Sequence, residues 1–176
     1  MTGLMIMNDL VFNYLDELIK DPRCELEYSS DYELLIAVML SAQTTDKRVN
    51  IVTKELFNKY PSLKALKEAK LEDIKQILRS LGSFNKKAVA VLKIANILYN
   101  DHNGTVPRDR NVLEALPMIG RKTASVFLLE YYDEPNMPVD THVERVSKRL
   151  GYAKESDNVI DIENKLKRKI PKGRWN

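Results

Sequence analysis

Apolar residues recur every three or four positions along almost the whole of this 176-residue chain. That spacing is typical of helices with one buried face, and it differs from the two-residue period of a half-buried strand. Six glycines and seven prolines are also few for the many turns of a β-sandwich or barrel. The sequence therefore predicts an all-α protein.

The periodic segments and the turn residues between them place the helices. The first follows an apolar stripe over 10–18 and is stopped by Asp21-Pro22. Ser30, with Glu33 three positions later, predicts a capping box before the run 34–40. Because this run is apolar almost all round, we expect it in the core. Further helices are predicted over 45–60, 71–81, 86–99, 107–115, 121–132, 141–150 and 159–169.

The chain is mildly basic, with a net charge of +3 and a pI near 8.8. Many proteins with no nucleic-acid partner carry as much, so the total charge decides nothing by itself. Positive side chains do concentrate toward the end of the sequence: Arg145, Lys148, Arg149, Lys165, Lys167, Arg168, Lys169, Lys172 and Arg174.

A single cysteine, Cys24, limits the chemistry open to this sequence. It excludes an internal disulfide framework and any site built from several thiolates. With only two histidines in the chain, a metal site at His142, Glu144 and Asp140 is a disfavoured interpretation, and we expect no metal. The apolar start is short, and no apolar run reaches the length of a membrane span. We therefore expect a cytoplasmic protein with no membrane partner.

The most informative stretch runs from Val112 to Val126, where a tight turn joins two predicted helices. A helix that begins at a turn directs free N–H groups and a positive dipole end outward, which favours a phosphate. Gly120 would let a DNA backbone approach, and Arg121 and Thr123 would add a charge and a hydroxyl. A plain helix connector is the alternative interpretation. A nucleotide-binding P-loop is excluded because its glycine and lysine spacing is missing.

This stretch resembles the helix-hairpin-helix of DNA glycosylases, whose signature runs Leu-Pro-Gly-Val-Gly-Arg-Lys-Thr-Ala. The segment 139–146, Val-Asp-Thr-His-Val-Glu-Arg-Val, resembles the part of that family that carries the catalytic aspartate. The segments 33–46 and 102–107 resemble family motifs as well, in the same order and spacing. From about Leu26 to Leu150 the chain is therefore similar to the endonuclease III family.

The resemblance implies two helical lobes. One spans 26–133 and contains the hairpin at 108–132, and the other combines 1–25 with 134–176. It also implies that Lys122 attacks the sugar and that Asp140 assists, so that damaged pyrimidines are removed and abasic sites are cleaved by β-elimination. A lysine at position 122 is typical of family members that both excise the base and cut the strand. The expected partner is damaged double-stranded DNA, bound by a monomer.

Further positions take expected roles from the same resemblance. Ser41 and Asp46 match the lining of the damaged-base cleft. The positions expected to face DNA are Gln43, Ser83, Met118, Gly120, Arg121, Thr123, His142 and Arg145. Asp140 also precedes a predicted helix, so we expect it to cap that helix in addition to its catalytic role.

The sequence departs from the family in three places. Ser83 replaces a leucine wedge, and Met118 replaces the first hairpin glycine, which would strain the backbone if that position needs a positive φ. Relatives continue for several dozen residues with a final helix and a four-cysteine iron–sulfur loop, whereas this sequence ends at 173–176. We therefore expect a shortened member without the cluster. An inactive DNA-binding remnant and a purely structural helical adaptor are the alternatives.

A faint internal repeat relates 81–87 to 116–122, at an offset of 35 residues. Each segment joins a pair of predicted helices. From the sequence alone, either shared backbone geometry or coincidence explains the match.

Overall fold

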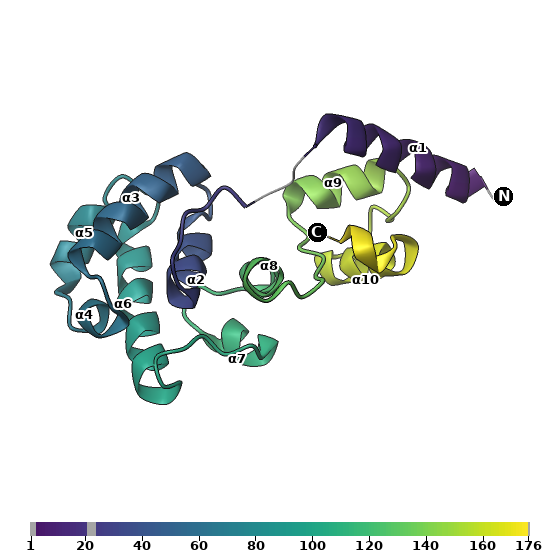
Figure 1. Ribbon diagram of the computed structural model, residues 1–176. Coiled ribbons are helices and arrows are strands. Elements are labelled where there is room, and N and C mark those ends of the chain that lie inside the picture. The colour runs from purple at the N-terminus through teal and green to yellow at the C-terminus, as the bar shows by residue number, and fades with distance from the viewer. Residues whose placement is uncertain (1–2, 21–23, 176) are drawn as a thin grey trace.

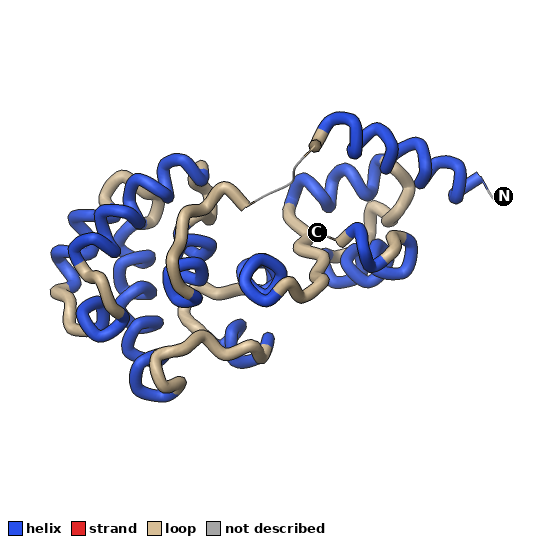
Figure 2. The backbone as a smooth tube through the Cα atoms, in the orientation of Figure 1, coloured by secondary structure: helices blue, strands red, loops and turns tan. Residues whose placement is uncertain are grey.

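A computed structural model describes residues 3–20 and 24–175. Within these ranges the chain forms helices and no strand, which confirms the all-α prediction (Figures 1 and 2). None of the described helices combines the length and the apolar character that crossing a membrane requires. The α-helices are α1 (Gly3–Leu18), α2 (Asp31–Leu40), α3 (Asp46–Lys59), α4 (Leu63–Lys67), α5 (Leu71–Leu78), α6 (Phe84–Asp101), α7 (Arg110–Ala115), α8 (Arg121–Tyr132), α9 (Thr141–Arg149) and α10 (Val159–Lys169).

A large apolar core, the first core, lies among α2 to α8. Helix α2 is at its centre: residues 34–40 are all buried, as predicted from their composition. It packs against α3, α6 and α8, while α4 and α5 lie along α6. Helix α8 begins after the hairpin turn, and its residues Phe127 and Leu128 are buried in this core, which anchors the hairpin to it.

A smaller apolar cluster, the second core, lies between α9, α10 and the segment that leads into α9. Its buried members are Met137, Val139, Tyr152, Ile162 and Leu166. Helices α1, α9 and α10 form one end of the molecule, and the elements of the first core form the other (Figure 1). Asp140 therefore stands at the start of α9, on the second core's side of the hairpin.

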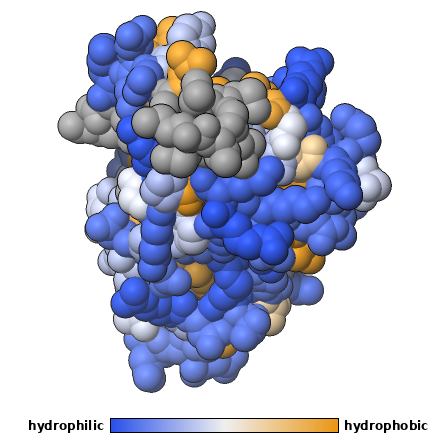
Figure 3. Space-filling view, turned by 90° about the vertical axis from the view of Figure 1, so that its right-hand side faces the viewer, coloured by the Kyte–Doolittle hydropathy of each residue, from blue (hydrophilic) through white to orange (hydrophobic). Residues whose placement is uncertain are grey.

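Helix α1 is joined to the last residues of the chain by polar contacts. Arg174 forms a bidentate pair with Asp16, at 3.0 and 3.1 Å, and its guanidinium lies 4.9 Å from the centre of the Phe12 ring. The apolar stripe of α1 remains exposed, with Leu10 67% and Tyr14 62% accessible. In a view of this end, hydrophilic side chains cover most of the visible face and hydrophobic ones show beside the grey atoms (Figure 3).

Several local predictions need correction. The Ser30 hydroxyl accepts no N–H from α2, and Glu33 accepts from the N–H of Ser29 instead, so the predicted capping box is wrong. Helix α7 starts three residues later than expected because the Asp109 carboxylate caps it. The short α4 was not predicted. The stop at Asp21-Pro22 lies outside the described residues.

Candidate active site

The hairpin turn presents the start of α8 to solvent. Met118, at φ 60°, has the left-handed conformation expected from the family glycine that it replaces, and its side chain is 46% exposed. Gly120 is the N-cap of α8 and carries no capping side chain, so the first N–H groups of the helix have no side-chain acceptor from the cap. A Cβ placed on Gly120 would meet no atom within 4 Å. The turn is therefore open to an approaching phosphate.

Lys122 and Asp140 meet across the junction of the two cores. The Lys122 ammonium, in the first turn of α8, lies 3.2 Å from Oδ2 of Asp140 at the start of α9. The lysine side chain is 55% exposed and that of the aspartate 30% exposed. An amine and a carboxylate at this distance can exchange a proton directly, and both can reach a group that arrives from solvent.

Asp140 divides its two oxygens between two tasks. Oδ1 accepts the N–H groups of His142 (2.9 Å) and Val143 (2.8 Å), which confirms the predicted helix cap. Oδ2 faces Lys122. Burial alone would raise the pKa of Asp140, but the Val143 N–H, the Lys122 ammonium and the His142 N–H outweigh it and lower that pKa below its ordinary value. The carboxylate is thus held in its charged form.

Arg121, the neighbour of Lys122, is bonded to the second core. Its Nε donates to Oε2 of Glu163 at 2.7 Å, and Lys167 donates to the other oxygen of the same carboxylate at 2.6 Å. Glu163 lies on α10 and is only 2% exposed. The Nε of Arg121 therefore ties the hairpin to α10, which is an additional role beside the phosphate contact expected from the sequence.

Three of the positions expected to face DNA share an unusual backbone. Gln43, Ser83 and Met118 all have φ near 60°, a region that costs residues with a side chain about 1 kcal/mol or more. All three are exposed. Ser83 and Met118 occupy corresponding positions of the internal repeat, and their matching φ favours shared turn geometry as the source of that repeat. The match is not complete, because α6 begins one residue after Ser83 whereas α8 begins three residues after Met118.

The remaining predicted site residues occupy several surfaces. His142 and Arg145 are exposed and adjacent on α9, with Nη2 of Arg145 3.1 Å from Nδ1 of His142. Thr123 and Asp46 are half-buried, in the first turns of α8 and α3. Ser41 donates its hydroxyl back to the carbonyl of Val38.

Two residues of this region were missed by sequence reasoning: Glu163 and Lys87. The Lys87 side chain is buried and donates to carbonyls that precede Gln43. A signal was available, because Lys87 falls in register with the apolar stripe Val91, Ile94 and Leu98 of α6. A lysine in such a stripe needs buried acceptors.

The described residues contain no group of three or more histidine, cysteine, aspartate or glutamate side chains that could hold a metal ion. A family-type iron–sulfur cluster needs four thiolates, and this sequence supplies only Cys24, which is half-buried. The residues present therefore do not fit the cluster, and no step of the chemistry is assigned to one.

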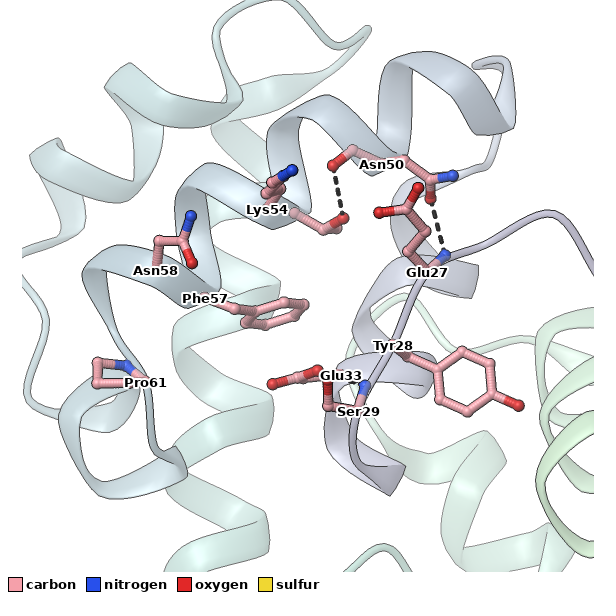
Figure 4. Close-up of a pocket in the computed structure, with 10 residues that line it drawn as sticks. Glu27, Tyr28, Ser29, Glu33, Asn50, Lys54, Phe57, Asn58 and Pro61 are labelled. Atoms are coloured by element: carbon pink, nitrogen blue, oxygen red, sulfur yellow. Dashed lines mark hydrogen bonds between the residues drawn. The ribbon is translucent and has the colours of Figure 1, made fainter.

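A separate hollow of about 270 Å³ lies between α3 and the segment that precedes α2 (Figure 4). Glu27, Glu33 and Lys54 line it together with Phe57, and the Glu27 N–H donates to Asn50 across one side. Neither Lys122 nor Asp140 lines this hollow.

The family model and two similar curated proteins point to the same family. The family model of the HhH-GPD superfamily of base excision DNA repair proteins matches residues 36–172. Endonuclease III of Bacillus subtilis (strain 168) is 44% identical over 161 residues, which are 92% of this chain and 74% of that protein. Endonuclease III of Escherichia coli (strain K12) is 44% identical over 150 residues, which are 85% of this chain and 71% of that protein.

Solved structures agree with these relatives. A trapped covalent intermediate of endonuclease III with DNA superposes with a TM-score of 0.91 at 42% identity, covering 99% of this chain and 82% of that one. A thermostable thymine-DNA glycosylase, at 21% identity, a TM-score of 0.76 and coverage of 96% and 80%, shares the fold. On these matches, the chain belongs to the endonuclease III family of the HhH-GPD superfamily.

Proposed function

We propose that this chain is a DNA glycosylase and abasic-site lyase of base excision repair, with Lys122 as its nucleophile and Asp140 as its carboxylate partner. The observation that carries the proposal is the 3.2 Å contact between Lys122 Nζ and Asp140 Oδ2 beside the open start of α8. Membership in the endonuclease III family supports the reaction class.

The geometry suits a displacement at the sugar. Once Lys122 has given a proton to solvent, its amine lone pair forms a bond to C1′ of the damaged nucleotide, and the bond from C1′ to the base breaks. The base leaves with the electron pair of the broken bond and takes up a proton from solvent. The charged oxygen of Asp140 stabilises the positive charge that develops on the sugar.

Strand cleavage follows from the same adduct. Opening of the sugar ring gives a Schiff base between Lys122 and C1′. This iminium makes the proton on C2′ acidic. Water takes up that proton, a C2′–C3′ double bond forms, and the C3′–O bond breaks, so that the 3′ phosphate leaves by β-elimination. Hydrolysis of the Schiff base then returns the free lysine.

The DNA contacts belong to the proposal as well. The first turn of α8, with Gly120, Arg121 and Thr123, would seat a phosphate, and the exposed pair His142 and Arg145 would face the backbone beside it. Gln43, Ser83 and Met118 would approach the bases from their left-handed turns, while Ser41 and Asp46 would line the base cleft. The resemblance to endonuclease III makes damaged pyrimidines in duplex DNA the expected substrate of a monomer.

Borohydride trapping on duplex DNA with one abasic site tests the proposal. Wild-type protein should form a stable cross-link because the reductant captures the Schiff base. Lys122→Gln should form none while retaining most of its DNA affinity, since it removes one cation among several. Lys93→Gln, at an exposed lysine of α6, is the matched control and should cross-link like wild type. DNA binding without any wild-type cross-link would instead identify an inactive remnant.

A further inference from the structure

Lys87 is a buried lysine that takes no part in the proposed reaction of Lys122 and Asp140. Its side chain is 2% exposed, and it lies in the first turn of α6, where the helix dipole disfavours a cation. Burial lowers the pKa of Lys87, which reflects the cost of keeping this charge away from water. An apolar residue would fill the same place in the core at a lower cost.

The Lys87 ammonium is balanced by the end of another helix. It donates to the carbonyl of Leu40 at 2.8 Å and to that of Ala42 at 2.9 Å. Among the residues that the structure describes, no carboxylate pairs with it. Carbonyls at a helix C-terminus lack N–H partners and carry the negative end of the dipole. The ammonium therefore supplies both hydrogen-bond donors and a positive charge at the end of α2.

This contact fixes the loop after α2. The Ala42 carbonyl belongs to the peptide bond that leads into Gln43, which is exposed and has a φ of 58°. A strained backbone of this kind persists only where its surroundings impose it. The Lys87 ammonium is a buried group of the core that holds the peptide directly before the strained residue.

Lys87 also lies one helical turn after the second left-handed residue, Ser83, which is the N-cap of α6. Its backbone N–H donates to the carbonyl of Ser83 at 3.1 Å, and Ser83 is exposed with a φ of 58°. One residue thus links Gln43 and Ser83, which come from segments about forty positions apart in the sequence. The Lys87 ammonium therefore connects the Gln43 loop to the helix that begins after Ser83.

We propose that Lys87 is a positioning residue that holds the Gln43 loop and the Ser83 turn at a fixed separation, so that both enter the DNA helix together when a damaged nucleotide is extruded. The inference rests on the proposed function, since it needs DNA as the partner. It assigns the buried ammonium to base extrusion rather than to the bond-breaking steps.

Extrusion from a paired duplex costs a few kcal/mol of pairing and stacking, and costs least where the nucleotide is already unpaired. The test therefore compares single-turnover base excision from a paired duplex with excision of the same lesion inside an unpaired bubble. Lys87→Met keeps the apolar stem and removes the donors. Lys93→Met, on an exposed face of the same helix, is the matched control.

Lys87→Met should slow excision from the paired duplex about tenfold or more, and excision from the bubble by less than about threefold. Lys93→Met should change neither rate. Equal slowing on both substrates, or no slowing, would overturn the inference. If wild type excises neither substrate and forms no cross-link, the proposed function has failed instead.

A double variant shows whether Lys87 acts through Gln43. If it does, adding Lys87→Met to Gln43→Ala should slow the paired reaction by no more than about twofold beyond Gln43→Ala alone, because coupled residues are not additive. If the double variant instead slows by the product of the two single-variant factors, the inference is contradicted. If Lys87→Met does not fold, the same two comparisons are made with Lys87→Gln, whose amide nitrogen is one atom short of the lysine Nζ position and carries no charge.

Discussion

Asp140 shows how one side chain can serve folding and chemistry together. One oxygen caps α9 through two N–H groups, and the other faces the Lys122 ammonium. Asparagine caps a helix about as well as aspartate, but it carries no charge. Substitution at this position can therefore separate the two tasks.

Asp140→Asn should leave the free energy of unfolding within about 1 kcal/mol of wild type, since the cap is kept. Base excision should slow by about 100-fold or more, because the charge that stabilises the developing cation is gone. Cleavage of a pre-formed abasic site should fall less, since no glycosidic bond breaks there. Single-turnover rates on the two substrates check this. Equal losses on both would contradict the division, and loss of folding would show that the charge of Asp140 is needed for the fold.

At the scale of helices, α8 and α10 are connected by a buried carboxylate. Glu163 accepts from Arg121 of α8 and from Lys167 of its own helix. Burial alone would raise the pKa of Glu163, but these two cations outweigh it and lower that pKa below its ordinary value of 4.5. Stability from this carboxylate is therefore fully present above pH 4.5 and is lost as the pH falls through the lowered pKa of the folded state.

Glu163→Gln should reduce the free energy of unfolding near neutral pH by about 1–3 kcal/mol, because two charge-assisted hydrogen bonds are weakened. The difference from wild type should shrink as the pH falls below 4.5, where this carboxylate begins to take up a proton in the unfolded chain but not yet in the folded one. Urea titrations over this range measure both effects. Glu155→Gln, at an exposed carboxylate, is the control and should change little. A difference that stays constant down to pH 3 would show that charge is not the cause.

How far the sequence predicts these elements depends on how local their causes are. The starts of α8 and α9 were predicted because Gly120 and Asp140 mark them within a few residues. Helix α4 was not predicted because a segment of five residues is too short to show a helical period of apolar residues. The Lys122–Asp140 pair came from the resemblance alone, and the left-handed φ of Gln43 follows a peptide that is bonded to Lys87, which is distant in the sequence.

At the scale of the whole molecule, the two cores differ in size. The first core buries α2 completely and draws on seven helices, whereas the second rests on a few side chains around α9 and α10. Each large apolar side chain that is buried contributes about 1.5–3 kcal/mol. The second core, which carries Asp140, is therefore expected to open locally at a lower free energy than the first.

Native-state hydrogen exchange tests this difference. Amides in 136–170 should exchange through openings of lower free energy than those in 34–40. Binding of DNA with an abasic site should raise protection in 136–170 most, because the ligand needs Asp140 and the hairpin in place together. Equal protection of the two ranges in the free protein would show that the cores unfold as one unit.

Locating the covalent bond to DNA tests whether Lys122 is the nucleophile. The borohydride-trapped complex would be digested with nuclease and protease, and the modified peptide sequenced by mass spectrometry. A sugar remnant is expected on Lys122, within the peptide that spans the start of α8. A remnant on any other lysine or on the amino terminus, with Lys122 unmodified, would contradict it.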